Sequence, residues 1–107
     1  MVVSRFGVYL VSLDPVIGSE ISKTRPCVVI SPDVMNRHLR TLIVAPLTSA
    51  GKSYPTRVAC RVQGKDGHVV LDQIRTVDRS RLIKPMGALE AEAASQVLRV
   101  LQKMFSQ

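Results

Sequence analysis

The feature that most limits how this chain can fold is an unbroken apolar run, Cys27–Ile30, which follows Arg25-Pro26 and ends at Ser31-Pro32. Successive side chains of a β-strand point to opposite faces, so four consecutive apolar residues predict a strand that is buried on both faces. We therefore expect a strand from Arg25 to Ser31 in the middle of the fold. A planar guanidinium at the rim of a rigid core is well placed to bind a phosphate, which makes Arg25 a candidate site residue.

The segments around this strand predict a mainly β fold. Further strands are expected over four stretches: 6–13, 41–47, 56–62, and one or two short strands within 68–77. A last strand or loop is expected at 82–89. Pro46 predicts an edge strand or a bulge, and the two glycines of 63–67 predict a tight turn. Ser31 is typical of the N-cap of a short helix that begins at Pro32 and ends around 36–40.

The C-terminal segment, 90–105, predicts the one long helix of the chain. Its apolar residues recur at helical spacing, at Ala94, Val97, Leu98, Leu101, Met104 and Phe105. We expect this helix to pack on the sheet, with Met104 and Phe105 in the core. Five or more short strands and one terminal helix predict a single domain, 1–107, folded as a small SH3-like barrel.

The charge and the cysteines narrow the classes of protein. A formal net charge of +7 and a pI near 10.1 favour a polyanionic partner, although a merely basic surface gives the same numbers. We expect neither a signal peptide nor a membrane span, because no stretch approaches about 20 apolar residues. Cys27 and Cys60 lie in apolar strand contexts typical of reduced core residues, so we expect a cytoplasmic protein.

Metal chemistry is disfavoured by the sequence. His38 and His68 are isolated, and there is no Cys-x-x-Cys, His-x-x-x-His or Asp-x-Asp motif, whereas zinc and two-metal sites need clustered ligands. We expect no metal and no other cofactor. RNA can be cut without a metal, because its own 2′-hydroxyl can attack the adjacent phosphorus. The enzyme then supplies a base, a cation on the phosphate oxygens and a donor for the leaving 5′-oxygen.

Two polar loops carry the candidates for these roles. Glu20 and Arg25 flank the first loop, 16–24, and Thr48 opens the second, 48–55. Arginine is effectively always protonated, so Arg25 suits a phosphate clamp, with Glu20 as the candidate base. Spacing alone does not show that the two loops meet. Each residue also has a plainer interpretation, as a solvated charge, a surface ion pair or a turn hydroxyl.

The chain as a whole resembles the MazF/PemK family of toxin endoribonucleases from bacterial toxin–antitoxin systems. The matching segments follow the family order over nearly the whole chain: Leu13-Asp14-Pro15 with Gly18-Ser19-Glu20, Arg25–Pro32 with Asn36, Val44–Ser49, Lys52–Pro55 and Asp72–Arg75. The resemblance implies an SH3-like barrel, usually dimeric. It also implies sequence-specific, metal-independent cleavage of single-stranded RNA, which leaves a 2′,3′-cyclic phosphate and a 5′-hydroxyl.

The same resemblance assigns residues and partners. Arg25 and Thr48 match the catalytic arginine and threonine of the family, and Glu20 matches its loop glutamate. The RNA groove is expected to be lined by Lys23, Thr24, Ser49, Lys52 and Tyr54, of which Tyr54 could stack on a base or anchor its loop. The expected partners are single-stranded RNA, a MazE-like antitoxin with an acidic tail, and a second copy of the chain in a homodimer.

Two departures and two rival functions stay open. The chain reads Arg5-Phe6-Gly7 where the family usually has Arg-Gly-Asp/Glu. Val70 stands where some PemK-type members have a catalytic arginine, so Asp72 is expected to be structural, bonding the backbone or a dimer partner. The first rival is a CcdB-like toxin that binds gyrase without an enzyme site, although that class lacks the Arg-Pro and Pro-Leu-Thr-Ser pairing. The second is a non-catalytic RNA-binding module.

Overall fold

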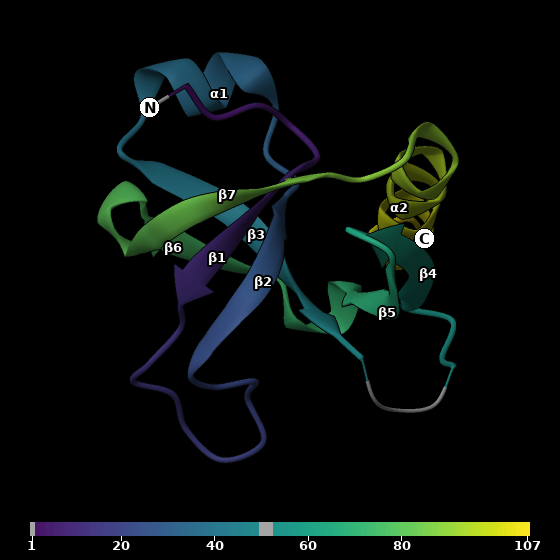
Figure 1. Ribbon diagram of the computed structural model, residues 1–107. Helices are drawn as coiled ribbons and strands as arrows, with labels where there is room; N and C mark the ends of the chain where they lie inside the picture. Colours follow the sequence, from purple (N-terminus) through teal and green to yellow (C-terminus); the bar gives the residue numbers. More distant parts are fainter. Residues whose placement is uncertain (1, 50–52) are drawn as a thin grey trace.

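The computed structural model describes residues 2–49 and 53–107 as a curled antiparallel sheet with two helices (Figure 1). The elements are β1 (Gly7–Ser12), β2 (Thr24–Val29), α1 (Asp33–His38), β3 (Thr41–Thr48), β4 (Arg57–Val62), β5 (Lys65–Val70), the 3₁₀ turn η1 (Leu71–Gln73), β6 (Arg75–Asp78), the 3₁₀ turn η2 (Arg79–Arg81), β7 (Leu82–Ala88) and α2 (Ala91–Met104). The strand order is β4-β5-β3-β2-β1-β7, with β6 also paired to β3. The expected mainly β fold with a C-terminal helix is confirmed.

Strand β2 lies between two hydrophobic clusters. It pairs with β1 on one side and with β3 on the other. Val28 and Ile30 belong to the cluster covered by α2, whereas Cys27 and Val29 belong to the cluster on the opposite face of the sheet. The exposed fraction is 0% for Cys27, Val28 and Val29 and 6% for Ile30. The prediction of a strand buried on both faces is confirmed.

Strand β3 is an inner strand that changes partner along its length. On one side it pairs with β2. On the other side, Thr41 to Val44 pair with β6, and Leu47 and Thr48 pair with β5. Pro46 lies between these two segments, where the absence of its N–H costs no pairing with β5 or β6. The prediction of an edge strand at Pro46 was therefore wrong, because a change of partner can also accommodate a proline.

The predicted helix N-cap at Ser31 was wrong by one residue. Pro32 precedes α1, and no side chain caps the helix. The Ser31 side chain is buried and is used elsewhere: its hydroxyl donates to Asn36 Oδ1 at 2.6 Å and accepts from the Ile43 N–H at 3.1 Å. Asn36 Nδ2 donates back to the Ser31 carbonyl at 2.9 Å. This buried network joins the end of β2, helix α1 and the start of β3.

The hairpin between β4 and β5 is tighter than expected. The turn consists of Gln63 and Gly64, both in the left-handed region with φ of 51° and 75°, and β5 already begins at Lys65. Gly67, predicted in the turn, is therefore a strand residue. A Cβ at Gly67 would lie 2.8 Å from the carbonyl oxygen of Thr48. Glycine at this position thus lets β5 pass directly against the end of β3.

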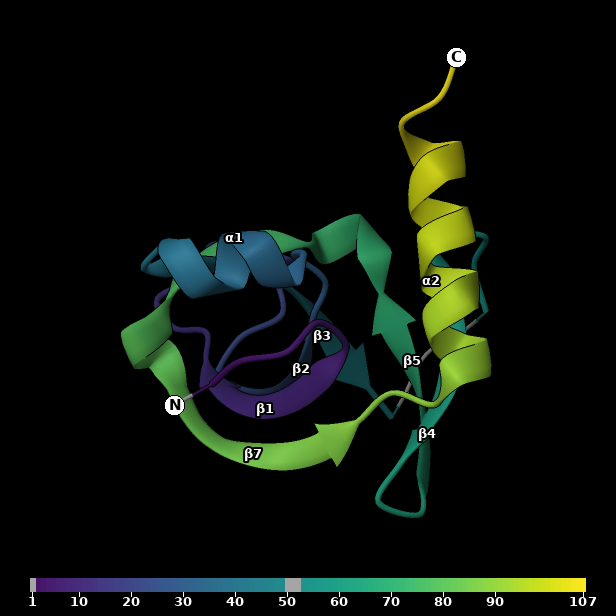
Figure 2. The ribbon, with the colours of Figure 1, turned by 90° about the horizontal axis from the view of Figure 1, so that it is seen from above.

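Helix α2 covers one face of the sheet and then projects beyond it (Figure 2). Its buried residues are Ala94, Val97 and Val100, and Met104 is partly buried against the same cluster. The expectation for Phe105 was wrong, because α2 ends at Met104 and the Phe105 side chain is 73% exposed. No helix among the residues with described structure is long and apolar enough to cross a bilayer.

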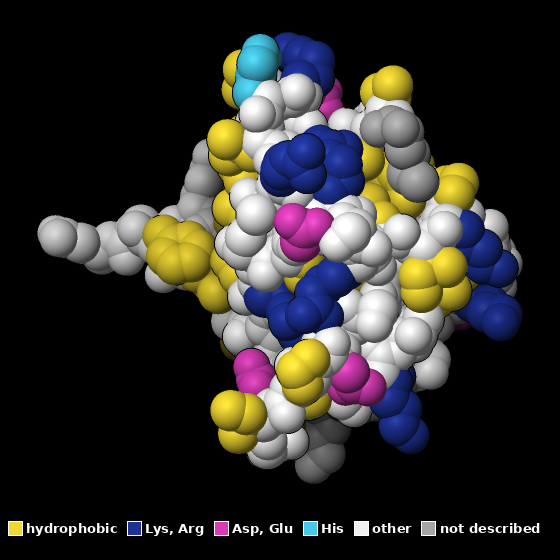
Figure 3. All heavy atoms as spheres, turned by 90° about the vertical axis from the view of Figure 1, so that its left-hand side faces the viewer, with side chains coloured by type: hydrophobic (Ala, Val, Ile, Leu, Met, Phe, Trp, Pro, Cys, Tyr) yellow, Lys and Arg dark blue, Asp and Glu magenta, His cyan; other side chains and the backbone are white. Residues whose placement is uncertain are grey.

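Basic charge is spread over several parts of the surface. Figure 3 shows the side of the barrel at the left of Figure 1, where groups of Lys and Arg side chains alternate with single Asp or Glu side chains. Of the 107 residues, 15 are Lys or Arg and 8 are Asp or Glu. Positive charge alone therefore does not locate a site, and the geometry of cavities and side chains has to do so.

Candidate functional site

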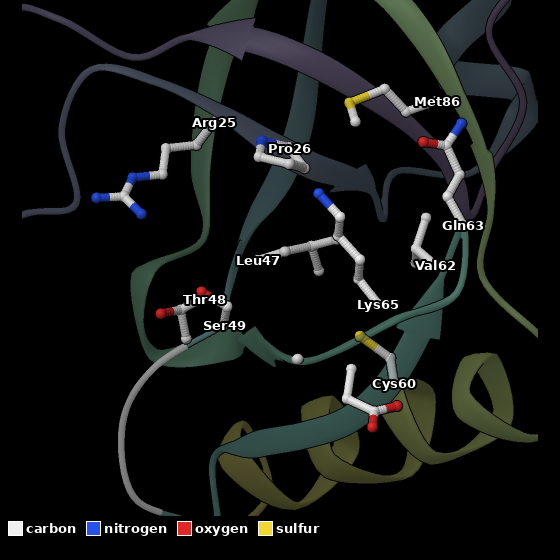
Figure 4. Close-up of a pocket in the computed structure, with 12 residues that line it drawn as sticks. Arg25, Pro26, Leu47, Thr48, Ser49, Cys60, Val62, Gln63, Lys65 and Met86 are labelled. Carbon is white, nitrogen blue, oxygen red and sulfur yellow. The ribbon is translucent and has the colours of Figure 1, made fainter.

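Arg25 and Thr48 line one cavity of about 250 Å³ at the end of the barrel where β2 begins and β3 ends (Figure 4). Residues of β4, of the β4–β5 hairpin and of β7 also line the cavity. Its apolar lining consists of Pro26, Leu47, Cys60, Val62 and Met86. In Figure 4 the guanidinium of Arg25 is directed away from this apolar lining, on the side where Thr48 and Ser49 lie. The arrangement is an apolar hollow with polar donors at one rim.

The pairing of β2 with β3 explains why Arg25 and Thr48 come together. Cys27 is paired with Pro46 in this antiparallel ladder. Continuing the register by two residues, from 27 to 25 and from 46 to 48, places Arg25 across from Thr48. Residues opposite each other on antiparallel strands have their Cβ atoms about 5 Å apart. The two polar loops meet, therefore, because the strands that carry them are neighbours.

His68 is a residue of this region that the sequence analysis missed. It is paired with Thr48 on the side of β3 away from β2. In the sequence, His68 stands out only as an isolated candidate metal ligand. Once β3 and β5 were known to pair, the register alone would have placed an imidazole beside the candidate threonine.

Arg25 is half-buried and anchored at one nitrogen. Its Nε donates to the Ser22 carbonyl at 3.3 Å. Among the described residues, the ion pairs are Arg57–Asp72 and Arg61–Asp66, and neither involves Arg25. A guanidinium has five N–H donors in a planar fork, so Arg25 keeps donors that can bind a phosphate.

Glu20 is not brought to this cavity. Its Oε1 accepts a hydrogen bond from the Ile17 N–H at 2.6 Å, within its own loop. Glu20 borders a different cavity, which it shares with Asp72, Gln73 and Arg75. The carboxylate would have to leave its bond with Ile17 to act beside Arg25.

The expected RNA-binding residues are placed unequally. Ser49 lines the cavity. Thr24 is exposed at the start of β2, and Lys23 before it has a left-handed φ of 69° with its N–H bonded to Asp14 Oδ1 at 2.9 Å. Lys52 lies outside the described residues.

Tyr54 takes part in a local stack. The Arg57 guanidinium lies 4.8 Å from the centre of the Tyr54 ring, which is a cation–π contact. Because the Tyr54 side chain remains 48% exposed, one face of the ring is still available to a base. Both of the interpretations offered for Tyr54 in the sequence therefore remain compatible with its position.

Asp72 makes its contacts within the chain. Asp72 Oδ1 accepts hydrogen bonds from Thr56 Oγ1 at 3.0 Å and from Arg57 Nε at 3.3 Å, and Oδ2 accepts from Arg57 Nη2 at 3.4 Å. Burial raises the pKa of Asp72, but the hydrogen bonds from Arg57 and Thr56 together outweigh it and lower the pKa below the ordinary value. The carboxylate thus fastens the start of β4 to η1.

The stabilising effect of Asp72 should disappear in acid. A carboxylate with a depressed pKa in the folded state stabilises the fold above its unfolded pKa of about 3.9, and the effect is lost as the pH falls through the folded value. We expect Asp72→Asn to lower the urea midpoint at pH 7 but to unfold like the wild type near pH 2.5. Asp66→Asn is the matched control, because exposed ion pairs contribute little at any pH. A difference between Asp72→Asn and wild type that persists unchanged at pH 2.5 would contradict this.

Neither cysteine is suited to nucleophilic chemistry. Both are free in the structure. Burial raises the pKa of Cys27 to about 12, although Arg75 opposes the rise. Burial also raises the pKa of Cys60, helped by the carboxylates of Asp66 and Glu90. Nucleophilic attack requires the thiolate, so the cavity beside Cys60 is not a thiol active site.

No group of three or more His, Cys, Asp or Glu side chains within the described ranges is arranged to hold a metal ion. The polar groups at the cavity rim include the Arg25 guanidinium and the Thr48 hydroxyl, and His68 is paired with Thr48 on the neighbouring strand. Such groups can bind a phosphate diester and stabilise negative charge on its oxygens.

Comparisons with known proteins agree on one family. A family model described as the PemK-like, MazF-like toxin of type II toxin–antitoxin systems matches residues 4–105. Endoribonuclease EndoA from Bacillus subtilis is 37% identical over 108 residues, which cover 95% of this chain and 93% of that protein.

Solved structures give the same result. MazF from Deinococcus radiodurans aligns with a TM-score of 0.87 and 27% identity, covering 100% of this chain and 99% of that one. A chain from a MazE–MazF structure of the same organism aligns with a TM-score of 0.73 and 26% identity, covering 98% and 96%.

Proposed function

The chain belongs to the PemK-like, MazF-like toxins of type II toxin–antitoxin systems, and we propose that it cleaves single-stranded RNA at the rim formed by Arg25 and Thr48. Its function is that of a toxin endoribonuclease. The observation that supports this site is that Arg25 and Thr48, each two residues beyond the paired Cys27 and Pro46 of β2 and β3, line the same largely apolar cavity. The proposal places the protein in the cytoplasm, where its RNA substrate is.

The proposed reaction is an internal transphosphorylation. The RNA 2′-oxygen attacks the adjacent phosphorus and loses its proton to a base. The bond from phosphorus to the 5′-oxygen breaks, and that oxygen takes up a proton. The products are a 2′,3′-cyclic phosphate and a 5′-hydroxyl, so the step consumes no water. Arg25 binds the phosphoryl oxygens as their negative charge grows, and Thr48 donates a hydrogen bond to a non-bridging oxygen.

Glu20 is the proposed base, and its position adds a condition to the proposal. Because the carboxylate is bonded to the Ile17 N–H in the structure, RNA binding must rearrange the loop that carries it. A loop that closes on its substrate is a common way to complete an active site. Cleavage by Glu20→Gln at the wild-type rate and with an unchanged pH profile would remove Glu20 from this role.

Cleavage should continue in excess EDTA. The test incubates the protein with a mixed-sequence RNA and then identifies the new ends by their reactivity. We expect 5′-hydroxyl ends that accept phosphate from a kinase, and 3′ ends that become reactive only after the cyclic phosphate is opened. Loss of cleavage in EDTA with recovery on adding Mg²⁺ would overturn the mechanism. Intact RNA under all conditions would favour the gyrase-binding or the non-catalytic alternative.

An antitoxin and a second copy of the chain are the proposed partners. The support for the antitoxin is the family, the MazE–MazF structure of a relative, and the excess of positive charge, which suits an acidic and partly disordered segment. The exposed apolar side chains of Ile83 and Phe105 are available to a partner surface. Light scattering should give a dimer at micromolar concentration, and an acidic antitoxin-like peptide should inhibit cleavage. A monomer in light scattering would contradict the proposed dimer. Cleavage that the acidic peptide does not inhibit would contradict the proposed antitoxin partner.

A further inference from the structure

We infer that the cavity beside Arg25 and Thr48 is a subsite for one nucleobase, that of the nucleotide flanking the cut, with Gln63 reading the edge of the base and Lys65 holding the adjacent phosphate. The inference rests on the proposed endoribonuclease activity. It extends that activity by assigning residues of the β4–β5 hairpin to base selection.

The size and lining of the cavity suit a single aromatic ring. Its volume of about 250 Å³ lies below the range of roughly 300–1,000 Å³ in which drug-sized ligands bind. Pro26, Leu47 and Met86 give it apolar walls that can contact the face of a base. Sequence-specific recognition of RNA commonly uses unpaired bases that are turned out and held by stacking or apolar contact.

Lys65 gives the cavity a cation separate from Arg25. In Figure 4 the Lys65 side chain extends from the hairpin toward Pro26, and both residues line the cavity. Neither of the ion pairs found in the described part of the chain uses Lys65. Asp66, the acidic side chain of the lining, is paired with Arg61 at 3.2 Å. Arg25 and Lys65 thus give one ring-sized hollow two cations, which match the two phosphates that flank a nucleoside.

Gln63 provides a group that can discriminate between bases. It lines the cavity from the hairpin turn, and its amide can both donate and accept hydrogen bonds, as the edges of bases require. The turn is well defined, since Gln63 and Gly64 both have the positive φ values of a tight two-residue hairpin. An aliphatic side chain of an acidic peptide would also fit the apolar walls, but it has no polar edge for the amide of Gln63 to recognise. This favours a nucleobase as the occupant.

The first experiment varies the RNA. One cut site is mapped in a long RNA, and short RNAs carrying that site are made with A, C, G, U or an abasic unit at each nucleotide that flanks the cut. We expect the abasic unit at one of these positions to lower single-turnover cleavage by about 10- to 100-fold, the usual effect of losing one stacked base. Equal cleavage of the abasic and intact RNAs at both positions would overturn the subsite. Cleavage of any of them would still support the proposed function.

Two variants separate recognition of the base by Gln63 from binding of the phosphate by Lys65. Gln63→Asn keeps a residue that tolerates positive φ and shortens the amide arm, and it should bring the rates for the four bases close together. Lys65→Met keeps the apolar stem and removes the charge, and it should lower all four rates by a similar factor. Lys84→Met is the matched control, because Lys84 is exposed on β7 outside the cavity. A base preference unchanged in Gln63→Asn would refute the role of Gln63.

The second experiment measures occupancy without cleavage. A 2′-deoxy nucleotide at the cut removes the attacking hydroxyl, so this RNA binds and stays intact. Because Cys60 lines the cavity, the bound base should protect its thiol from a methanethiosulfonate reagent at pH 9, and the abasic version should not. Equal labelling with both RNAs would overturn the inference. The inference would also be overturned if an acidic peptide protected the Cys60 thiol and the RNA did not, because the cavity would then belong to a protein partner.

Discussion

Arg25→Ala should cleave RNA about 10²–10³ times more slowly than the wild type while remaining folded. Losing one preorganised donor to a developing oxyanion has this effect in other enzymes. Arg25→Lys should restore little, because an ammonium cannot reproduce the two parallel hydrogen bonds of the guanidinium fork. The fold should survive, since burial in β2 comes from Cys27, Val28 and Val29.

The measurement is single-turnover cleavage of one short RNA, with a thermal melt of each variant. Arg37→Ala is the control, because Arg37 is an exposed cation on α1, outside the cavity of Arg25 and Thr48. Wild-type cleavage by a folded Arg25→Ala protein would remove the catalytic assignment. If Arg25→Ala and Arg37→Ala lost the same factor in cleavage rate, the effect would come from the overall positive charge of the protein and not from a specific role of Arg25.

Gly67→Ala should lower cleavage about 10²-fold although Gly67 carries no functional group. The added Cβ would lie 2.8 Å from the Thr48 carbonyl oxygen, and a backbone atom cannot move aside by changing rotamer. The end of β3 must therefore shift, and a misplacement of about 1 Å can cost about 10²-fold in rate. Overpacking of this kind also destabilises by about 1–3 kcal/mol.

Gly87→Ala is the control for the loss of a glycine as such. Gly87 has a φ of +98° and no atom within 4 Å of an added Cβ, so the substitution strains the backbone away from Thr48. We expect Gly87→Ala to be less stable than wild type but to cleave RNA at a similar rate below its melting temperature. If Gly67→Ala retained the wild-type rate constant, the contact with Thr48 would not position the site.

Local sequence patterns predicted the parts of the fold that depend on runs of buried apolar residues or on the spacing of apolar residues along a helix. The run from Cys27 to Ile30 predicted the doubly buried strand because no half-exposed strand tolerates it. The 3.6-residue spacing predicted α2, but it could not show that the helix ends at Met104 and leaves Phe105 exposed, because periodicity carries no information about where the covering sheet stops.

The site depended on information that local patterns do not contain. The meeting of Arg25 with Thr48 follows from which strands are neighbours and in what register. The same is true of the placement of His68 beside Thr48 and of Pro46 at a change of partner. The family resemblance pointed to Arg25, Thr48 and Glu20, whereas the structure brings only the first two together and bonds Glu20 within its loop.

The position of β2 between two hydrophobic clusters also determines how the site can open. The amide protons of Val28 and Val29 should exchange with solvent only when the whole domain unfolds, whereas those between Ile17 and Glu20 should exchange through local fluctuations. An opening that moved β2 would have to disrupt both clusters at once. Any control of Arg25 short of global unfolding must therefore cover it or act on the neighbouring loop, and the strand that carries it stays fixed in the active and the inhibited protein alike.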